Sequence, residues 1–459
     1  MKSVKTESEL FVIPDEHERY ILYNPLNRAV GIVNDHVVLT IKKYLESGIT
    51  NLTKSETDVI QSLYESKILS YESLNKILPP EDFVFSPNEV TLFLTTRCNL
   101  CCTYCYANGG NTRKDISLEA CCAAIDLISR NALSAGLDRF IVGFHGGGEP
   151  FCVWPLMMSC VSYAKETAKK TGLSVEIYSA TNGILSEKQC QYIAEHFNSL
   201  NISADGPPFI QNSQRPLKTG APSSDKLLET IQYFERVHFP YNIRTTVTQN
   251  SSQYLPDIVR YFSENCPSLD QIHVEPSWYC GRCYQTGEQT PQTDQFVQDF
   301  IKASELGDQL GLRLYYSGAR LDSLSYKFCG APGEGFSVTP YEAVTSCFEV
   351  IDPHDDRVEL FHYGQYDKQT KKYIFIESKL ARLRSLTVEN IDFCGDCFCR
   401  WHCAGDCLAK SLTNFTDPEH SGSDRCNINR ALTLDQIKRA IKSHNVQHIS
   451  GVSDEKTSQ

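Results

Sequence analysis

The stretch VTLFLTTRCNLCCTYCYANGG, residues 90–110, decides the fold class of this chain. Its first six residues are apolar or β-branched, as in a buried strand. The spacing C-x3-C-x2-C then follows at Cys98, Cys102 and Cys105. Three thiolates on one loop can hold three irons of a 4Fe–4S cluster and leave the fourth iron open to another ligand. Zinc is the alternative, but it prefers four protein ligands or includes His or carboxylate, and this loop contains no His.

Strand-like and helix-like patterns alternate from about residue 88 to residue 316. The expected strands are Val90–Thr95, Phe140–Phe144, Ser174–Ala180, Leu200–Ala204, Ile243–Thr248 and Gln271–Glu275. Helical runs lie between them, for example Ser117–Ser134 and Asp225–Glu235. Six βα units in series predict an α/β fold whose parallel sheet is open or curled into a partial (β/α)6 TIM-like barrel. In such a sheet the ligand lies at the carboxyl ends of the strands.

Further strand ends carry glycine-rich or polar segments. These segments are His145-Gly146-Gly147-Gly148-Glu149-Pro150, Ala180-Thr181-Asn182-Gly183, Ser203-Ala204-Asp205-Gly206-Pro207 and the strand start at Arg244. Together with the cysteine loop, in which Tyr104 precedes the last cysteine, they resemble the motifs of the radical S-adenosylmethionine (SAM) enzymes.

The resemblance implies that Cys98, Cys102 and Cys105 hold a 4Fe–4S cluster whose open iron chelates SAM. One electron would cleave SAM to methionine and a 5′-deoxyadenosyl radical, which abstracts a substrate hydrogen. The expected SAM contacts are Tyr104, Gly146, Gly147, Gly148, Glu149, Thr181, Asn182, Ser203, Asp205 and Arg244. Glycines suit such contacts because they let backbone approach a ligand closely. Arg244 is equally well read as an ordinary strand-end residue, and Cys101 falls outside the ligand spacing.

Composition restricts the cellular context. The chain has 459 residues, 41% of them hydrophobic, and a net charge of −12, which argues against nucleic acid or an anionic membrane as partner. The first residues lack the apolar run of a signal peptide, so we expect a cytoplasmic protein. Its 20 cysteines should then be metal ligands, catalytic groups or buried residues rather than disulfides. The cysteines expected in the core are Cys121, Cys122, Cys152, Cys160 and Cys190.

A second group of cysteines follows the spacing C-x2-C-x5-C-x3-C from Cys394 to Cys407. This pattern resembles the SPASM extension of radical SAM enzymes, which holds two auxiliary 4Fe–4S clusters; a zinc site is the alternative. The resemblance assigns the outer cluster to Cys394, Cys397, Cys403 and Cys426, and the inner cluster to Cys329, Cys347 and Cys407. The fourth inner ligand stays open among Cys280, Cys283, Cys399 and a free iron position. One departure is Glu342, which stands where the family pattern has Gly, so the turn there must be built differently.

Residues 1–85 form an expected unit of their own. A hairpin, Glu18–Tyr23 with Ala29–Val33, precedes a helix capped by Asn34 and a second helix from Ser55 to Ser66, and Pro79-Pro80 marks a linker. This winged-helix-like order resembles the precursor-peptide recognition domain of radical SAM peptide maturases, which binds a leader peptide as an added strand. The unit has nine Lys and Arg against thirteen Asp and Glu, which is wrong for a DNA binder. A purely structural cap is the remaining alternative.

The combined expectation is a radical SAM/SPASM maturase of a ribosomally made precursor peptide, forming a thioether or carbon–carbon crosslink. Its units would be residues 1–85, the barrel 86–316, the auxiliary-cluster domain 317–440 and a tail 441–459. A ferredoxin or flavodoxin would donate electrons, and Asp205, Glu275 and Glu349 are possible general bases. Alternatives are a sulfatase-maturing enzyme, a peptide epimerase or decarboxylase, an iron–sulfur electron carrier or peptide-binding scaffold, and a zinc-stabilised binding protein. Against sulfatase maturation, Phe348 rather than an acidic residue follows Cys347.

Overall fold

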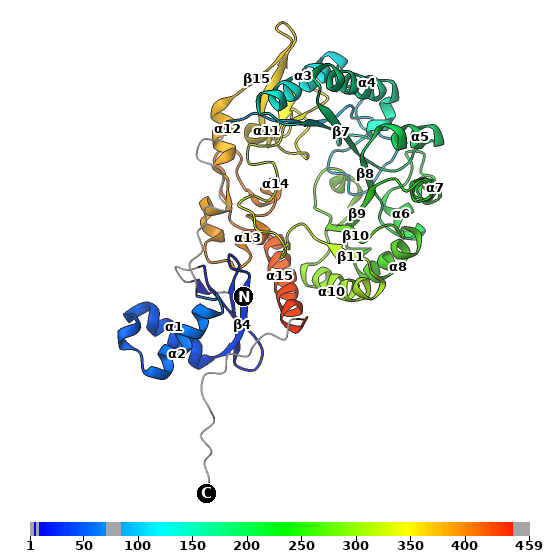
Figure 1. The fold of residues 1–459 in the computed structure, drawn as a ribbon. Coiled ribbons are helices and arrows are strands. Elements are labelled where there is room, and N and C mark those ends of the chain that lie inside the picture. The colour runs from blue at the N-terminus through cyan, green and yellow to red at the C-terminus, as the bar shows by residue number, and fades with distance from the viewer. Residues whose placement is uncertain (1–3, 6–8, 70–83, 444–459) are drawn as a thin grey trace.

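The computed structural model describes residues 4–5, 9–69 and 84–443. A small N-terminal sheet with two helices lies beside the C-terminal part of the chain, and a large curved sheet carries helices on its outer side (Figure 1). Among the described residues, every helix is too short or too polar to cross a lipid bilayer.

The N-terminal sheet is antiparallel, in the order β1-β2-β3-β4. Its elements are β1 (Val4–Lys5), β2 (Phe11–Pro14), β3 (Arg19–Asn24) and β4 (Ala29–Asn34), followed by α1 (Asp35–Ser47) and α2 (Lys54–Glu65). The predicted hairpin is β3–β4, and Asn34 caps α1 by accepting a hydrogen bond from the Val37 amide. Both predicted helices are present, whereas β1 and β2 were not predicted. The linker predicted at Pro79-Pro80 lies outside the described residues.

Seven neighbouring strands of the large sheet run parallel, in chain order. They are β5 (Glu89–Leu92), β6 (Arg139–Phe144), β7 (Ser174–Thr181), β8 (Ser199–Ser203), β9 (Tyr241–Val247), β10 (Gln271–Pro276) and β11 (Arg313–Tyr315). The six predicted strands are all present, and the short β11 extends the sheet. Because β11 pairs with no described strand other than β10, the sheet curls without closing over the described residues. The predicted α/β class with a partial barrel is confirmed.

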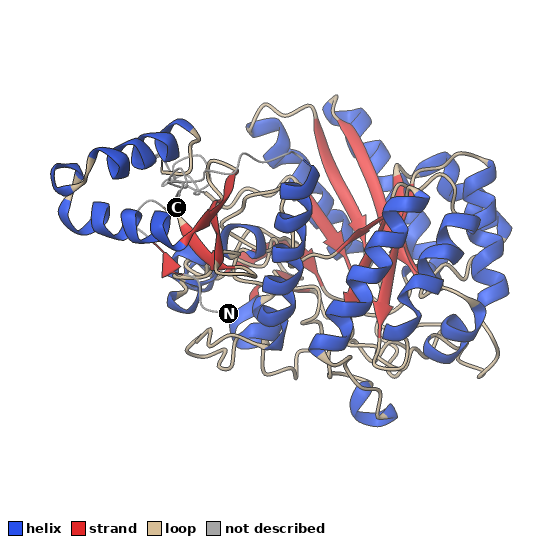
Figure 2. Ribbon diagram, turned by 90° about the horizontal axis from the view of Figure 1, so that it is seen from below, coloured by secondary structure: helices blue, strands red, loops and turns tan. Residues whose placement is uncertain are grey.

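Helices cover the outer face of this sheet, as two perpendicular views show (Figures 1 and 2). They are α3 (Leu118–Ser134), α4 (Trp154–Thr171), α5 (Glu187–His196), α7 (Ser224–Arg236), α8 (Leu255–Asn265) and α10 (Thr293–Leu310). The short α6 (Pro208–Gln214) and α9 (Cys283–Thr286) instead contact the cysteine loop. Of the cysteines expected in the core, Cys121, Cys160 and Cys190 are buried. The prediction is wrong for Cys122 and Cys152, which are only half-buried.

The C-terminal part continues the same sheet. β12 (Ser337–Val338) pairs parallel with β5, and β13 (Ala343–Thr345), β14 (His362–Asp367) and β15 (Lys372–Phe375) follow as an antiparallel extension. The helices here are α11 (Val358–Phe361), α12 (Glu377–Arg384), α13 (Arg400–Cys403), α14 (Leu408–Ser411) and α15 (Asp424–Ser443). α15 thus continues three residues past the predicted start of the tail, 441.

Candidate functional site

The cysteine loop leaves the carboxyl end of β5 and is held by the segment that follows α6. The backbone amides of Cys101 and Thr103 donate to Pro216 O and Gln214 O, both at 2.9 Å. The Lys218 amide donates back to Asn99 O at 2.8 Å. These backbone bonds fix the path of the loop over the mouth of the barrel.

The three thiols of the C-x3-C-x2-C loop are free and lie near one another. Burial raises the pKa of Cys98 and of Cys102 to about 12, and the other thiolates of the set raise both pKa values further. Asn182 Nδ2 lies 3.7 Å from Cys98 Sγ, and Arg215 Nη1 lies 4.0 Å from Cys102 Sγ. Thiols in such surroundings ionise readily only when a cation binds them, which fits a metal-cluster site.

Tyr104 and Asp205 lie behind this loop in a buried polar network. The Tyr104 hydroxyl donates to Asp205 Oδ2 at 2.5 Å, and Arg215 Nε lies 3.0 Å from the same oxygen. Gln214 Nε2 donates to that oxygen at 2.7 Å. Burial raises the pKa of Tyr104 well above its ordinary value, so the phenol stays protonated. Asp205 is therefore occupied in anchoring the loop, which makes it a poor candidate for the general base.

Glu149 joins the ends of two adjacent strands. Its carboxylate accepts from Thr181 Oγ1 at 2.9 Å and from the Asn182 amide at 2.7 Å. Burial nevertheless raises the pKa of Glu149 to about 7. Two expected SAM contacts, Glu149 and Thr181, are thus bonded to each other.

The glycines before Glu149 let this segment pack on the cysteine loop. Gly147 has φ +76°, and a Cβ on it would lie 3.0 Å from Thr95 O. A Cβ on Gly148 would overlap the Arg97 carbonyl, and the Glu149 amide donates to Arg97 O at 2.7 Å. Any side chain at either position would push the two loops apart, whereas Gly146 has more room.

Arg244, on β9, is exposed at the mouth of the barrel beside Ser203, with which it pairs in register. Among the residues the structure describes, its guanidinium makes no hydrogen bond or ion pair. Burial and the Arg244 charge lower the pKa of His145 to about 4, so its imidazole is neutral. His145 Nδ1 is buried without a hydrogen-bond partner in the described chain. A free guanidinium and an unsatisfied imidazole nitrogen at a strand-end mouth fit a polar, anionic ligand.

The loop after β10 clamps the cysteine loop, and sequence reasoning missed the residue that does it. Arg282 is buried and donates to Cys102 O at 3.0 Å and to Gly109 O at 2.7 Å, while its amide donates to Cys105 O at 2.9 Å. Gly281 has φ +55°, and a Cβ on it would overlap the carbonyl oxygens of Cys105 and Tyr106. The sequence had singled out the neighbouring Cys280 and Cys283 for their thiols. The only signal available for Arg282 was its place between them.

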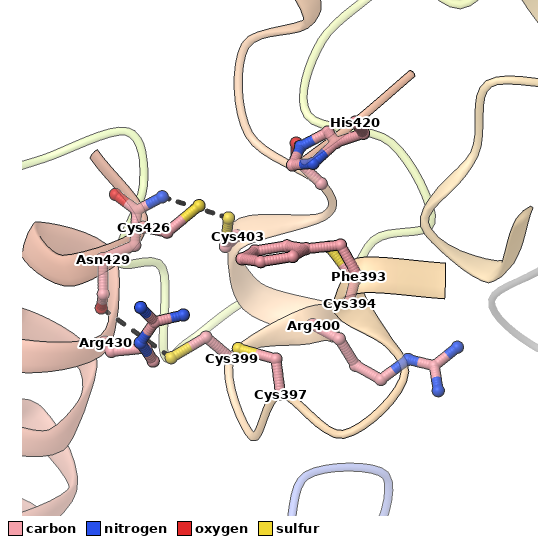
Figure 3. A pocket seen from close by; sticks show the side chains of 11 residues that line it. Phe393, Cys394, Cys397, Cys399, Arg400, Cys403, His420, Cys426, Asn429 and Arg430 are labelled. Atoms are coloured by element: carbon pink, nitrogen blue, oxygen red, sulfur yellow. Dashed lines mark hydrogen bonds between the residues drawn. The ribbon is translucent and has the colours of Figure 1, made fainter. Parts of the chain in front are cut away.

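A second site lies in the C-terminal part, in a narrow pocket lined by five cysteines (Figure 3). Cys394, Cys397, Cys399 and Cys403 come from one segment, and Cys426 comes from the first turn of α15. Asn429 Nδ2 donates to Cys403 Sγ at 3.2 Å. A hydrogen bond from Cys399 and the Arg430 charge lower the pKa of Cys397 to about 6. All four cysteines expected for the outer cluster therefore line one pocket.

The inner set lies around a half-buried ion pair. Burial raises the pKa of Cys347 well above its ordinary value and that of Cys407 to about 12, and Cys329 contributes to both shifts. Glu349 Oε1 lies 3.0 Å from Lys410 Nζ, and its other oxygen lies 3.4 Å from Arg357. Burial alone would raise the pKa of Glu349, but the two cations bring it below its ordinary value.

The three candidates for a fourth inner ligand lie in different surroundings. Cys399 lines the outer pocket, and Cys283 Sγ donates to Trp278 O at 3.6 Å. Cys280 is half-buried, and the Glu349 and Lys410 charges both act on its pKa, which burial raises to about 12. Of the three, Cys280 lies on the side of the inner set.

Glu275, the remaining candidate base, is also paired, as Glu349 is. Glu275 Oε1 contacts His273 Nε2 at 2.8 Å, and Glu275 Oε2 lies 3.4 Å from Arg425. Burial would raise the pKa of Glu275, but His273 and Arg425 bring it well below its ordinary value.

Glu342, at the turn where a family glycine was expected, has φ +65° and so keeps the left-handed conformation without the glycine.

Across the described residues, no three His, Cys, Asp or Glu side chains converge on one point in the way a single metal ion requires. A 4Fe–4S cluster does not need that convergence, because each iron takes its own thiolate.

Residues 92–261 match the family model of the radical SAM superfamily. The matched range begins at the last residue of β5, ends within α8, and includes the cysteine loop and the ends of strands β6 to β9.

Curated relatives match the same part of the chain. An uncharacterised protein of Methanocaldococcus jannaschii is 32% identical over 170 residues, 37% of this chain and 56% of that protein. The serine-type anaerobic sulfatase-maturating enzyme of Bacteroides thetaiotaomicron is 24% identical over 177 residues, 36% of this chain and 41% of the enzyme. The chain spans about half the length of the curated relatives it matches.

Solved structures share the fold over more of the chain. Native anSMEcpe with bound AdoMet superposes with a TM-score of 0.58 at 17% identity, covering 78% of this chain and 99% of that one. Streptococcus suis SuiB bound to precursor peptide SuiA gives 0.52 at 14% identity, covering 92% and 99%. At these identities the likeness establishes the fold alone.

Proposed function

We propose that this protein is a radical SAM/SPASM maturase that modifies a ribosomally made precursor peptide. The observation that carries the proposal is the pairing, in one chain, of a strand-end cysteine loop on a radical SAM domain with a separate pocket lined by Cys394, Cys397, Cys403 and Cys426. In this reading residues 1–85 recognise the leader, 86–316 form the catalytic barrel and 317–440 hold auxiliary clusters.

Cys98, Cys102 and Cys105 would hold the catalytic 4Fe–4S cluster, with outer and inner auxiliary clusters on the two other cysteine sets. Bound there, the cluster would supply the one-electron reduction needed for SAM cleavage. The chain's own part is positioning. Arg215 and Arg282 hold the cysteine loop, and Arg244, whose side chain has no bonded partner among the described residues, would receive the methionine carboxylate.

The N-terminal unit supports a peptide substrate. In the described part of the chain β4 pairs only with β3, so its other edge has no strand partner there, and an added strand would pair with that edge. Backbone hydrogen bonds along that edge would supply affinity for a leader peptide. The acidic charge of the unit argues against nucleic acid, and a small electron-transfer protein such as a ferredoxin or flavodoxin would serve as donor.

The proposed product is an intramolecular thioether or carbon–carbon crosslink. Three cysteines are assigned to the inner set, so one iron there would be free to bind a substrate thiolate during thioether formation. Glu349 and Lys410 lie beside that position as a half-buried acid–base pair.

Sulfatase maturation is the second candidate, favoured by the two sulfatase-maturating relatives. The acidic residue expected after Cys347 is replaced by Phe348, whose ring lies 4.6 Å from that of His145. Glu349, one residue further, is bound to Lys410 and Arg357. Aldehyde formation on a Cys- or Ser-containing sulfatase peptide, without any crosslinked product from a leader-bearing peptide, would favour this candidate.

The first test compares anaerobically reconstituted wild type with a Cys98→Ala/Cys102→Ala/Cys105→Ala variant. We expect about twelve irons to fall to about eight, with 5′-deoxyadenosine formed only by the wild type. A wild type with about four irons plus zinc would contradict the auxiliary clusters. A wild type that does not cleave SAM would contradict the enzyme assignment.

A further inference from the structure

The N-terminal sheet packs directly on the outer cysteine pocket. Phe11, Ile13, Ile21 and Tyr23 share one buried cluster with Phe398, Cys399 and Cys403. The same views place the sheet beside α13 and α15 (Figures 1 and 2). A unit expected only to bind a leader peptide is thus also part of the wall behind the pocket.

Polar contacts connect Tyr23 on β3, and Glu9 just before β2, to three consecutive residues of α13. Glu9 accepts from Trp401 Nε1 at 2.9 Å and lies 3.4 Å from Arg400 Nη1. The Tyr23 hydroxyl lies 2.5 Å from His402 Nε2. All five side chains are at least nine-tenths buried. Cys403, a proposed outer-cluster ligand, is the next residue of the same helix.

The His402 tautomer follows from its other contacts. His402 Nδ1 lies 3.1 Å from Arg320 O and 3.0 Å from Ser323 O, and carbonyl oxygens only accept. Nδ1 therefore carries the proton, and Nε2 accepts from the Tyr23 hydroxyl. The sheet, α13 and the 320–323 loop form one chain of directed hydrogen bonds.

Further contacts hold the turns between the strands of this sheet. Asp15 Oδ1 lies 2.9 Å from Lys438 Nζ on α15, and Arg28 Nη2 donates to Asp322 O at 3.3 Å. α15 is the helix that brings Cys426 to the pocket. Both segments that supply outer-pocket cysteines are thus anchored to the N-terminal sheet.

We propose that Tyr23 and Glu9 are positioning residues of the outer cysteine pocket, which couple the N-terminal sheet to the cluster held there. The inference deepens the proposed function and rests on it in treating the pocket as a cluster site. A leader peptide that adds a strand to this sheet would then bind to a unit that is already hydrogen-bonded to α13. Leader binding and the electronic state of the outer cluster become linked through the hydrogen bonds of Tyr23 with His402 and of Glu9 with Trp401.

The test uses purified full-length holoprotein with Tyr23→Phe and Glu9→Gln, each of which preserves side-chain shape. Tyr20→Phe is the matched control, because Tyr20 lies on the same strand but its hydroxyl interacts with Asp35 instead. Cys399, which is buried under the sheet and is not an assigned ligand, reports on the packing through its alkylation rate in peptide mapping. We expect alkylation to be about fivefold to tenfold faster in both variants, the scale of one lost buried hydrogen bond, and unchanged in the control.

A second measurement separates positioning from mere packing. In the Cys98→Ala/Cys102→Ala/Cys105→Ala background, the electron paramagnetic resonance spectrum and midpoint potential report only auxiliary clusters. We expect Tyr23→Phe and Glu9→Gln to change the spectrum and the midpoint potential. Tyr20→Phe should change neither quantity.

Unchanged alkylation and unchanged spectra in both variants would overturn the inference, and so would equal effects of the Tyr20→Phe control. The alkylation measurement needs neither SAM nor peptide. Failure of peptide modification would therefore count against the proposed function without touching this result.

Discussion

Arg282 shows how one buried side chain can define a loop that carries no regular structure. Its guanidinium donates to Cys102 O and Gly109 O, and its backbone amide donates to Cys105 O. Buried backbone carbonyls need such donors, because a loop has no ladder to satisfy them. The geometry of the three thiols therefore depends on a residue about 180 positions away in the chain.

Arg282→Ala should lower the free energy of unfolding by about 2–4 kcal/mol, since it removes the side-chain donor from buried Gly109 O and a charged donor from Cys102 O, which keeps only the Cys105 amide. It should also reduce iron bound at the Cys98 site. Anaerobic urea unfolding and iron analysis measure the two effects. The control is Arg260→Ala, whose exposed ion pair with Asp257 should contribute less than about 0.5 kcal/mol. Equal effects of the two variants would contradict the clamp.

At the scale of elements, strand ends in this sheet are tied to one another by side chains rather than by hydrogen bonds of the ladder. Glu149, just after β6, holds Thr181 and Asn182 at the end of β7. Glycines then allow the same segment to pack on the cysteine loop after β5. Three consecutive strand ends thus form one rigid edge, on which the proposed cofactor contacts lie.

This edge should carry a pH dependence. Because the folded-state pKa of Glu149 is about 7 and its ordinary value is 4.5, the folded protein holds the proton more tightly than the unfolded chain. The stabilisation is complete below about pH 4.5 and is lost as the pH rises through 7. Relative to Glu149→Gln, wild type should lose about 3 kcal/mol of unfolding free energy between about pH 5 and pH 8.

Denaturant unfolding of both proteins across this pH range measures the difference. Glu166→Gln, at an exposed position on α4, is the control and should follow the wild-type curve. A Glu149→Gln curve parallel to wild type would mean that Glu149 is ionised at every pH tested.

At the scale of the whole molecule, one guanidinium joins the barrel to the cysteine-rich part. Arg425 on α15 lies 2.9 Å from Asp406 Oδ2 and 3.4 Å from Glu275 Oε2 on β10, with its guanidinium over the Tyr316 ring. The ion pair between Arg425 and Asp406 lies next to both cysteine sets in the sequence. Asp406 directly precedes Cys407 of the inner set, and Arg425 directly precedes Cys426 of the outer set. The barrel and both auxiliary sets therefore share one buried charge network.

Arg425→Met should cost about 3–5 kcal/mol of unfolding free energy, because it leaves buried Asp406 without its cation and leaves Glu275 with His273 alone. Hydrogen exchange should rise at β10 and α15 together. The matched control is Arg439→Met on the same helix, whose carboxylate partners Asp308 and Asp435 are more exposed. A loss confined to α15 would mean that the network does not join the two parts.

Local patterns in the sequence were enough for the parallel strands, the hairpin and the capped helices. Strand and helix periodicities arise within ten to twenty residues, so each element is readable from its own stretch. The strands β11, β12 and β13, of two or three residues each, lack enough periods to be recognised. Cys152 illustrates the same limit, because an apolar neighbourhood in sequence predicted burial, whereas the fold leaves its thiol half-buried beside the cysteine loop.

The sequence by itself determined the α/β class and the spacing of the cysteines on each loop. Only the tertiary structure decided which side chains hold those loops: Arg282 over the first set, Glu349 and Lys410 beside the inner set, and Tyr23 against His402 at the outer pocket. The last pair is separated by 379 residues. Such contacts carry no local pattern, because they arise where the curved sheet and the N-terminal sheet bring distant segments together, and burial then makes each hydrogen bond there costly to lose.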